Sequence, residues 1–228
     1  MQYVTVLHFL IDRCMKLYWI KTHRLIKRFF PGFVWDVPTN TKTVYLTFDD
    51  GPTPEVTEWV LDELRKHDIK ATFFCIGNNI ENHPGIFKKV VAEGHAIGNH
   101  TFNHLNGWNT GHNNYLENTI TTAKSISNHH PHQAASGLFR PPYGKIKGSQ
   151  AKALRALGYK IIMWDVLSAD FDRTITPQQC LENVIKNTRE GSIIIFHDSV
   201  KASENLRYAL PKAIEYLKEN NFNFGKLD

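Results

Sequence analysis

Two histidines four residues apart are the first side chains in this sequence that could do chemistry. His100 and His104 lie in the stretch HTFNH, and on one face of a helix this spacing brings two imidazoles within reach of one metal ion. The pair alone is a weak signal, because a chain with 12 histidines among 228 residues also contains such pairs by chance. Thr101 follows the first histidine, where zinc proteases with this spacing have Glu, so the sequence disfavours that class of protease.

The stretch TFDDGP supplies two adjacent carboxylates, Asp49 and Asp50, at the end of an apolar run. Adjacent carboxylates repel each other, which raises the pKa of one of them unless a cation is bound. Neighbouring residues on a strand point to opposite faces, so we expect a turn starting at Gly51 to bring both toward one cavity. One Asp would then complete a metal site with the two imidazoles, and the other would stay free as a base. The alternative is an Asp at the start of a helix with a neighbour on the surface.

Two further stretches place polar groups at the ends of apolar runs. In RPPYG, two prolines hold Arg140 stiffly, so its guanidinium can pair with a carboxylate in bidentate fashion. In the same loop, Tyr143 and Gly144 can present a main-chain N–H to a developing oxyanion. His197, in IIIFHD, is a candidate general acid, and Asp170, in LSADF, can hydrogen-bond it and keep it protonated. The alternatives are a solvent-facing arginine and an ordinary core or surface histidine.

The elements that must position these groups alternate along the chain from residue 43 onward. Near-continuous apolar strands that alternate with amphipathic helices predict a parallel sheet covered by helices, either a barrel or an open doubly wound sheet. In both, polar groups at the carboxyl ends of the strands meet on one rim. We expect strands over 43–48, 71–76, 95–99, 137–140, 159–166, 192–198 and 222–227, and helices over 54–67, 85–94, 115–127, 148–158, 176–189 and 203–220, the last kinked or divided at Pro211.

Residues 1–42 are expected to form an amphipathic helical leader and linker, and residues 43–228 the catalytic domain. The apolar run over residues 4–11 is too short to span a bilayer and lacks the flanks of a cleavable signal peptide. We therefore expect a cytoplasmic or peripherally membrane-associated protein. Basic residues alternate with apolar ones over residues 16–30, a pattern that suits a membrane interface. The alternative is a helix packed on its own domain.

The net charge bears on the possible binding partners, and the cysteine content bears on disulfide bonds. The net charge of +5, from 27 basic and 22 acidic residues, suits either an anionic partner or an ordinary solvated surface. No nucleic-acid-binding motif is present, and the charge is modest, so we expect no nucleic-acid partner. Three widely spaced cysteines do not indicate a set of disulfides. We expect a monomer.

Taken in order, the stretches TFDDGP, HTFNH, RPPYG, SADF and IIIFH resemble the five motifs of the polysaccharide deacetylase family, the NodB-type carbohydrate esterases. The resemblance covers residues 43–227. It implies a deformed (β/α) barrel with about seven parallel strands. It also implies metal-dependent hydrolysis of N-acetyl groups on N-acetylglucosamine units of a glycan, such as peptidoglycan or a chitooligosaccharide. One alternative is a related C–N amide hydrolase acting on a small molecule or lipid-linked sugar. Another is a non-catalytic module that binds a glycan or an anionic surface, with the basic leader as its main contact.

The resemblance implies a role for each motif residue. Asp49 would be the general base, positioned by Arg140, and His197 the general acid, tuned by Asp170. The metal ligands would be Asp50, His100 and His104; this donor set favours Zn²⁺, and Co²⁺ or Ni²⁺ also fit it. In the substrate site, Tyr143 would donate its main-chain N–H to the oxyanion, and Ile195 would contact the acetyl methyl group. Phe171 would form an aromatic wall. Trp108 would be either a platform for a sugar ring or a core residue. Phe171 departs from the family pattern, which has Trp after the tuning Asp and thus an indole N–H.

Overall fold

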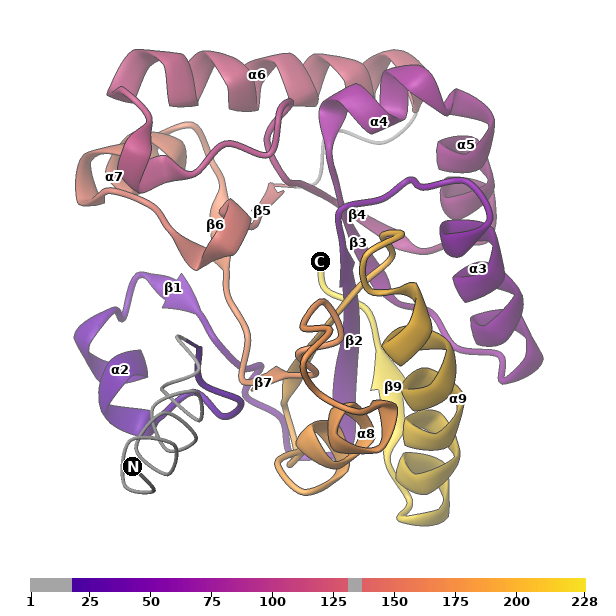
Figure 1. Cartoon of the computed structure of the whole chain (residues 1–228). Coiled ribbons are helices and arrows are strands. Elements are labelled where there is room, and N and C mark those ends of the chain that lie inside the picture. Colours follow the sequence, from indigo (N-terminus) through magenta and orange to yellow (C-terminus); the bar gives the residue numbers. More distant parts are fainter. Residues whose placement is uncertain (1–17, 131–136) are drawn as a thin grey trace, which may run out of the picture.

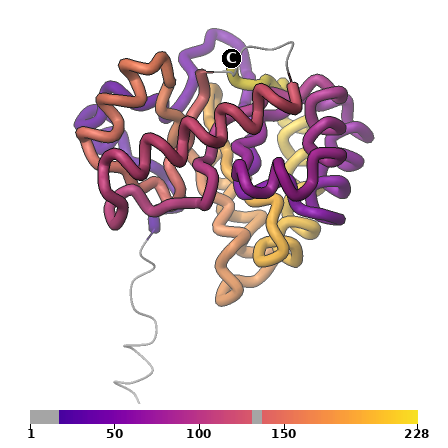
Figure 2. The backbone as a smooth tube through the Cα atoms, turned by 90° about the horizontal axis from the view of Figure 1, so that it is seen from above, coloured from indigo at the N-terminus to yellow at the C-terminus, as the bar shows by residue number. Residues whose placement is uncertain are grey.

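A curled parallel sheet with helices around its outside forms the centre of the structure (Figures 1 and 2), a computed structural model that describes residues 18–130 and 137–228. The order of neighbouring strands is β1-β6-β5-β4-β3-β2-β8-β7, with β9 paired to β2, and every ladder between these strands is parallel. The strands are β1 Phe33–Val34, β2 Thr43–Asp49, β3 Thr72–Cys75, β4 Ala96–Asn99, β5 Leu138–Phe139, β6 Lys160–Ile162, β7 Val166–Leu167, β8 Ile193–His197 and β9 Asn223–Gly225.

The structure confirms the predicted deformed (β/α) barrel, with more strands than expected among the described residues. The run expected as one strand over 159–166 is divided into β6 and β7, and β1 adds a short strand that the sequence did not predict. The helices are α2 Arg24–Phe29, α3 Val56–Lys66, α4 Gly77–Asn82, α5 Pro84–Ala92, α6 His112–His129, α7 Gly148–Ala156, α8 Pro177–Ile185 and α9 Ser203–Glu219, with 3₁₀ turns η1 Gly107–Asn109 and η2 Pro142–Gly144. Helix α9 runs through Pro211 as one element.

The central strand β2 shows how the sheet separates its core from its site. Its alternate residues Val44, Leu46 and Phe48 are fully buried in the cluster that the sheet forms with the helices. The Phe48 ring stacks on Phe73 with a centroid distance of 5.0 Å. Because side chains alternate along a strand, Thr47 and Asp49 lie on the opposite face, inside the barrel. The pleat of β2 therefore turns the carboxylate at its end toward the interior.

The described part of the N-terminal segment packs against the barrel rather than standing apart from it. The Thr22 N–H donates to the Asp165 carbonyl at 2.9 Å, and the Leu167 N–H donates to the Ile20 carbonyl at 2.8 Å. Lys21 and Lys27 both pair with the fully buried Asp165 carboxylate. Residues 18–36 thus contact the barrel through hydrogen bonds, ion pairs and strand pairing, whereas helix α2 within them has no buried residue. The choice between a membrane-interface helix and a helix packed on its own domain stays a prediction. The expectations for residues 1–17 lie outside the described residues, and the domain boundary at residue 43 stays a prediction.

Candidate active site

A cavity of about 450 Å³ opens where the predicted rim was expected, at the carboxyl ends of the strands. Asp49 and His197 end β2 and β8, and His100 follows β4 directly. The predicted site residues that line the cavity are Asp49, Asp50, His100, His104, Tyr143, Phe171, Ile195 and His197. Arg140 and Asp170 lie behind this wall, fully buried. Trp108 is not part of the lining; it is 59% exposed, and its indole N–H donates to the Ile146 carbonyl at 3.3 Å.

Three potential ligand atoms converge in this cavity. The Asp50 carboxylate lies 3.3 Å from His104 Nε2 and 3.8 Å from His100 Nε2. One atom from each residue lies within 4.8 Å of the other two. His100 donates its Nδ1–H to the Arg140 carbonyl at 2.8 Å, which leaves the Nε2 lone pair directed at the carboxylate. Two imidazoles and one carboxylate are a donor set that a divalent transition metal ion accepts, so these residues fit such an ion.

His100 and Asp50 carry the charges that a metal site requires of them. Burial lowers the pKa of His100 to about 4, so its imidazole is neutral at pH 7. Burial by itself would raise the pKa of Asp50, but the hydrogen bond from His104 and the charge of His197 hold it well below its usual range. A neutral imidazole and an ionised carboxylate are the forms that bind a cation.

The two histidines do not share a helix face, and that expectation was wrong. Residues 100–104 form a loop after β4, with left-handed backbone conformations at Thr101 (φ 61°) and His104 (φ 53°). These two left-handed residues are incompatible with a right-handed helical turn. The loop, and not helical periodicity, brings the second imidazole back beside the first.

The turn after β2 also differs in detail from the expectation. Asp50 itself, and not Gly51, adopts the left-handed conformation, with φ 86°. Glycine is required at position 51 for a different reason: a Cβ there would lie 2.0 Å from Asp198 Oδ2. The close approach of this backbone to a buried carboxylate thus excludes any side chain at residue 51.

Asp198 is a residue of the site that the sequence did not reveal. Its buried carboxylate accepts the Gly51 N–H at 3.0 Å and the Thr57 hydroxyl at 2.5 Å, and its own N–H donates to the Asp49 carbonyl at 3.0 Å. Burial raises the pKa of Asp198 to about 7 against the lowering effect of the Thr57 hydrogen bond. These bonds join β8 to the turn that carries Asp50. The only sequence signal was an acid directly after His197.

Asp49 is held by Arg140 on the interior face of the barrel. Arg140 Nη1 donates to Asp49 Oδ1 at 2.6 Å and to the Thr47 hydroxyl at 2.8 Å, while Nη2 donates to the Met163 carbonyl at 3.0 Å. The pairing is through one nitrogen, not the bidentate contact that the sequence suggested. The second oxygen, Asp49 Oδ2, lies 3.7 Å from His100 Nε2. One carboxylate oxygen is therefore fixed by the arginine and the other faces the ligand cluster.

His197 lies on another wall of the cavity with Asp170 behind it. Asp170 accepts the His197 Nδ1–H at 2.7 Å through one oxygen and the His197 main-chain N–H at 2.7 Å through the other. Burial alone would lower the pKa of His197, but attraction to Asp170 and the hydrogen bond to it raise the value to about 9. The Phe171 ring contacts the imidazole edge-on at a centroid distance of 5.1 Å. The cavity thus holds a protonated imidazole whose Nε2–H can donate to a substrate.

Tyr143 contacts the ligand cluster in a way that the sequence did not suggest. Its hydroxyl lies 3.1 Å from His104 Nδ1, and its ring lies edge-on to that imidazole at 4.6 Å. A partner at Nδ1 orients the ring and leaves Nε2 for an ion. The backbone at Tyr143 is left-handed, with φ 59°. The expected role of its main-chain N–H stays a prediction.

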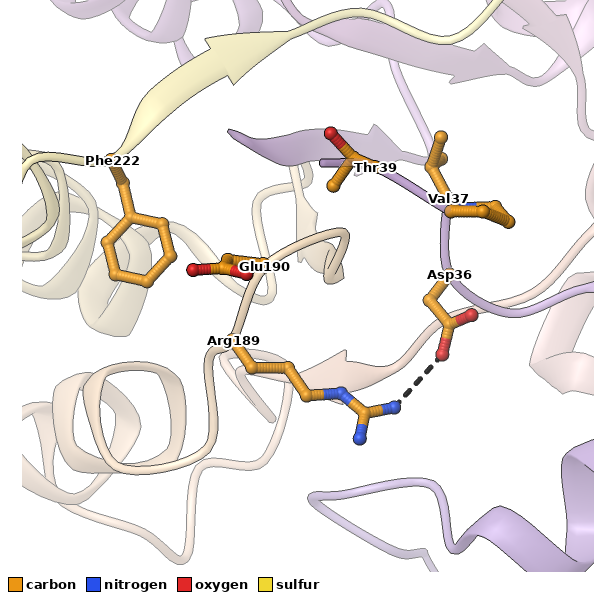
Figure 3. A pocket seen from close by; sticks show the side chains of 7 residues that line it. Asp36, Val37, Thr39, Arg189, Glu190 and Phe222 are labelled. Atoms are coloured by element: carbon orange, nitrogen blue, oxygen red, sulfur yellow. Dashed lines mark hydrogen bonds and ion pairs between the residues drawn. The ribbon is translucent and has the colours of Figure 1, made fainter. Parts of the chain in front are cut away.

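A second cavity, of about 550 Å³, contains none of the predicted site residues. Arg189 and Glu190 precede β8, so the cavity lies beyond the amino end of the strand that His197 ends. Arg189 pairs with Asp36 across it at 3.1 Å, while Phe222 forms its far side (Figure 3). The motif residues thus line the first cavity, and none of them lines this one.

Comparison with known proteins supports the same family as the motifs. Residues 36–162 match the family model described as polysaccharide deacetylase. The chain is 37% identical to a peptidoglycan-N-acetylglucosamine deacetylase of Bacillus cereus over 195 residues, covering 85% of this chain and 90% of the relative. It is 33% identical to a chitooligosaccharide deacetylase of Azorhizobium caulinodans, covering 74% of this chain and 79% of the relative.

A crystal structure of a peptidoglycan N-acetylglucosamine deacetylase, in complex with a naphthyl-substituted N-hydroxybenzamide, matches with a TM-score of 0.80. Its sequence is 34% identical to this chain, and the match covers 91% of that protein and 86% of this one. A pseudoenzyme from Bacillus anthracis also matches, with a TM-score of 0.75 and 26% identity, covering 85% of this chain and 66% of that one. The fold therefore occurs with and without activity, and the site residues must carry any argument about function. With the family-model match, the similar relatives and all five motifs at one rim, the chain belongs to the polysaccharide deacetylase family.

Proposed function

We propose that this protein hydrolyses N-acetyl groups from N-acetylglucosamine units of a glycan, with peptidoglycan and chitooligosaccharides as the candidate substrates. The observation that carries the proposal is one cavity in which Asp49 and the protonated His197 flank the cluster of Asp50, His100 and His104. A base, an acid and a cation site are the three components that hydrolysis of an unreactive amide needs. The relatives named as peptidoglycan and chitooligosaccharide deacetylases support this choice of substrate.

Asp50, His100 and His104 would hold a divalent cation, for which we propose Zn²⁺, with Co²⁺ and Ni²⁺ as the other ions that suit these donors. When bound, such an ion supplies Lewis acidity, which makes water more acidic and a carbonyl carbon more electrophilic. His100 is pre-set for this role because its Nδ1–H is bound to the Arg140 carbonyl. Tyr143 orients His104 in the same way through Nδ1.

The other site residues move protons and orient the substrate. Asp49 accepts a proton from the attacking water, and Arg140 fixes this carboxylate by donating to its Oδ1 at 2.6 Å. The Tyr143 main-chain N–H donates to the oxyanion that forms on the carbonyl oxygen. His197 donates its Nε2 proton to the departing amine nitrogen, so that a neutral amine leaves. Ile195 and Leu167, both buried in the lining, form the apolar wall for the acetyl methyl group.

Acetate release from a panel of N-acetylated glycans tests this function. The panel contains peptidoglycan, N-acetylglucosamine oligomers and N-acetylglucosamine itself, each assayed with and without a chelator. We expect chelator-sensitive acetate release from at least one polymer or oligomer. Release only from the monosaccharide would favour an amide hydrolase of small molecules, and no release from any member would refute the proposal.

Replacement of Asp170 by Asn is expected to move the alkaline loss of activity to lower pH. His197 acts as an acid only when protonated, so activity falls as the pH rises through its pKa of about 9. Without the Asp170 charge the imidazole loses its main stabiliser, its pKa falls, and the loss begins earlier. A bound cation would lower the pKa of His197 in both the unmodified enzyme and the variant. The prediction therefore concerns the difference in pH profile between the two. The measurement is kcat/KM for acetate release from pH 5 to 10 for both enzymes. If the two enzymes lost activity at the same alkaline pH, this role of Asp170 would be excluded.

We also propose that the N-terminal segment contacts membranes that contain anionic lipids. Trp19, Leu25 and Phe29 are 64%, 56% and 75% exposed. Arg24 and Arg28, on the same helix α2 as Leu25 and Phe29, are exposed basic residues. Exposed aromatic and basic side chains on one short segment suit a membrane interface. None of the helices in residues 18–130 and 137–228 is long and apolar enough to cross a bilayer.

Sedimentation with vesicles tests the membrane contact. We expect binding to vesicles containing phosphatidylserine that is stronger than binding to phosphatidylcholine vesicles and that weakens as salt is added. The Phe29→Ser variant should bind less, whereas Val200→Ser, which removes a 70% exposed apolar side chain elsewhere, should bind like the unmodified protein. Equal binding of both variants would refute a contact at this segment.

A further inference from the structure

Tyr18, from the N-terminal segment, reaches the cavity that holds the motif residues. Its side chain is partly buried and lines the cavity together with Phe171 and Leu167. Its ring lies edge-on to Phe171 at a centroid distance of 5.5 Å, and Phe171 in turn contacts His197. No motif of the sequence includes Tyr18, so the cavity has an aromatic wall residue that the family pattern does not supply.

The backbone around Tyr18 is fixed to the barrel. Ile20 accepts the Leu167 N–H at 2.8 Å, which joins the segment to β7 just before the loop that carries Asp170 and Phe171. Lys21 continues the attachment, with its ammonium 2.5 Å from the buried Asp165 carboxylate and 2.6 Å from the Asn187 carbonyl. These contacts fasten the backbone two and three residues after Tyr18 to the barrel.

The Tyr18 hydroxyl is also held in place. It donates to Asp172 Oδ2, while Asp172 Oδ1 accepts the Thr174 N–H at 2.9 Å. Asn205 holds the same loop by donating to the main-chain carbonyls of Asp170 at 3.1 Å and Asp172 at 3.3 Å. With its polar end bound, the tyrosine presents its ring to the cavity in one orientation. Such a pre-ordered aromatic surface binds a ligand without losing much side-chain entropy.

We propose that Tyr18 is a substrate-positioning residue whose ring, beside Phe171, packs against the apolar face of a sugar ring of the glycan. The inference rests on the proposed function, because it concerns how the same site holds its substrate. The alternative is that Tyr18 only fastens the N-terminal segment to the barrel. The two roles predict different effects of substitution. Replacing a residue that contacts the substrate changes KM for the glycan, whereas replacing one that only fastens the segment changes the stability and the fraction of folded enzyme.

Two substitutions at Tyr18 and two matched controls separate these roles. Tyr18→Phe keeps the ring and removes the hydrogen bond to Asp172, and Tyr18→Ala removes both. The controls are Tyr208→Phe and Tyr208→Ala, because Tyr208 also donates its hydroxyl to a side chain, Gln178 at 2.9 Å, and lies outside the cavity lining. Each variant is assayed for kcat and KM on the preferred glycan and for its thermal unfolding midpoint.

We expect Tyr18→Ala to raise KM by about 10-fold with kcat within about 3-fold of the unmodified enzyme, since the lost contact contributes to binding. Tyr18→Phe should keep KM within about 3-fold, because the ring remains, and both Tyr208 variants should be unaffected. An unchanged KM in Tyr18→Ala would refute the inference. So would a fall in kcat with a lower unfolding midpoint and no change in KM, which indicates fastening alone. An unmodified enzyme that is inactive on every glycan would refute the proposed function and this inference with it.

Discussion

Asp49→Asn is expected to lower kcat for acetate release by about 10²- to 10⁴-fold, the range that a general base contributes. Asn has nearly the same shape, and its amide oxygen can still accept the Arg140 Nη1–H that now binds Asp49 at 2.6 Å. It cannot accept a proton from water. The metal content should be unchanged, because Asp50, His100 and His104 are intact. The measurement combines steady-state acetate release with metal analysis of the purified variant.

The control for this substitution is Asp62→Asn, which changes an exposed carboxylate that pairs with Arg65 on the surface. It should leave both kcat and metal content unchanged. If Asp49→Asn turned over at a rate near that of the unmodified enzyme, another group would have to be the base. Loss of metal from Asp49→Asn would instead place Asp49 among the ligands, since its second oxygen lies 3.7 Å from His100 Nε2.

His104→Ala is expected to lose both the metal and the activity. It removes one of three donors, so affinity for the ion should fall by more than about 100-fold, beyond the effect of losing an outer-shell partner. The side chain is 26% exposed, and it contacts Tyr143 and Asp50 rather than the core, so the fold should survive. The measurement is metal content after dialysis together with acetate release.

The matched control for this variant is His112→Ala, because His112 is an exposed histidine at the start of α6. It should keep both the metal and the activity. Retention of one equivalent of metal by His104→Ala would show that the ion is held elsewhere. A metal-free His104→Ala that still released acetate would contradict the need for the ion.

The sequence predicted most of the strands, and the polar residues that follow them, because both depend on local patterns. An apolar run that ends in Asp49, and another that ends in His197, indicate a buried strand and a polar residue at its carboxyl end. Parallel strands bring such ends together, so one cavity followed from topology alone. The family resemblance then assigned the base to Asp49 and the metal ligand to Asp50, a choice that the local patterns left open.

The loop at His100–His104 shows where local reasoning failed. The four-residue spacing suits a helix, but Thr101 and His104 both adopt left-handed conformations that sequence periodicity does not predict. Side-chain hydrogen bonds hold the loop instead: Thr101 N–H donates to Asn99 Oδ1 at 2.9 Å, and Leu105 N–H donates to the Thr101 hydroxyl at 3.0 Å. The two imidazoles still converge, by a different backbone path.

Two residues of the site could not be found from the sequence because their partners lie far along the chain. Asp198 contacts Gly51 across 147 residues, and Tyr18 contacts Asp172 across 154. Neither position carries a periodic or spacing signal. Tyr18 also lies in the segment predicted to be a leader, where basic and apolar residues in alternation predict an amphipathic helix. Only the packing of residues 18–36 on the barrel brings it to the cavity.

Titration of metal-free enzyme with Zn²⁺, followed by acetate release from an N-acetylated glycan, tests the central claim most directly. The account predicts no acetate release without metal. It also predicts a rate that increases with added Zn²⁺ and stops increasing at one equivalent per chain, because Asp50, His100 and His104 form one site. Full activity in the metal-free enzyme, or an equal response from a variant with all three ligands replaced by Ala, would contradict it.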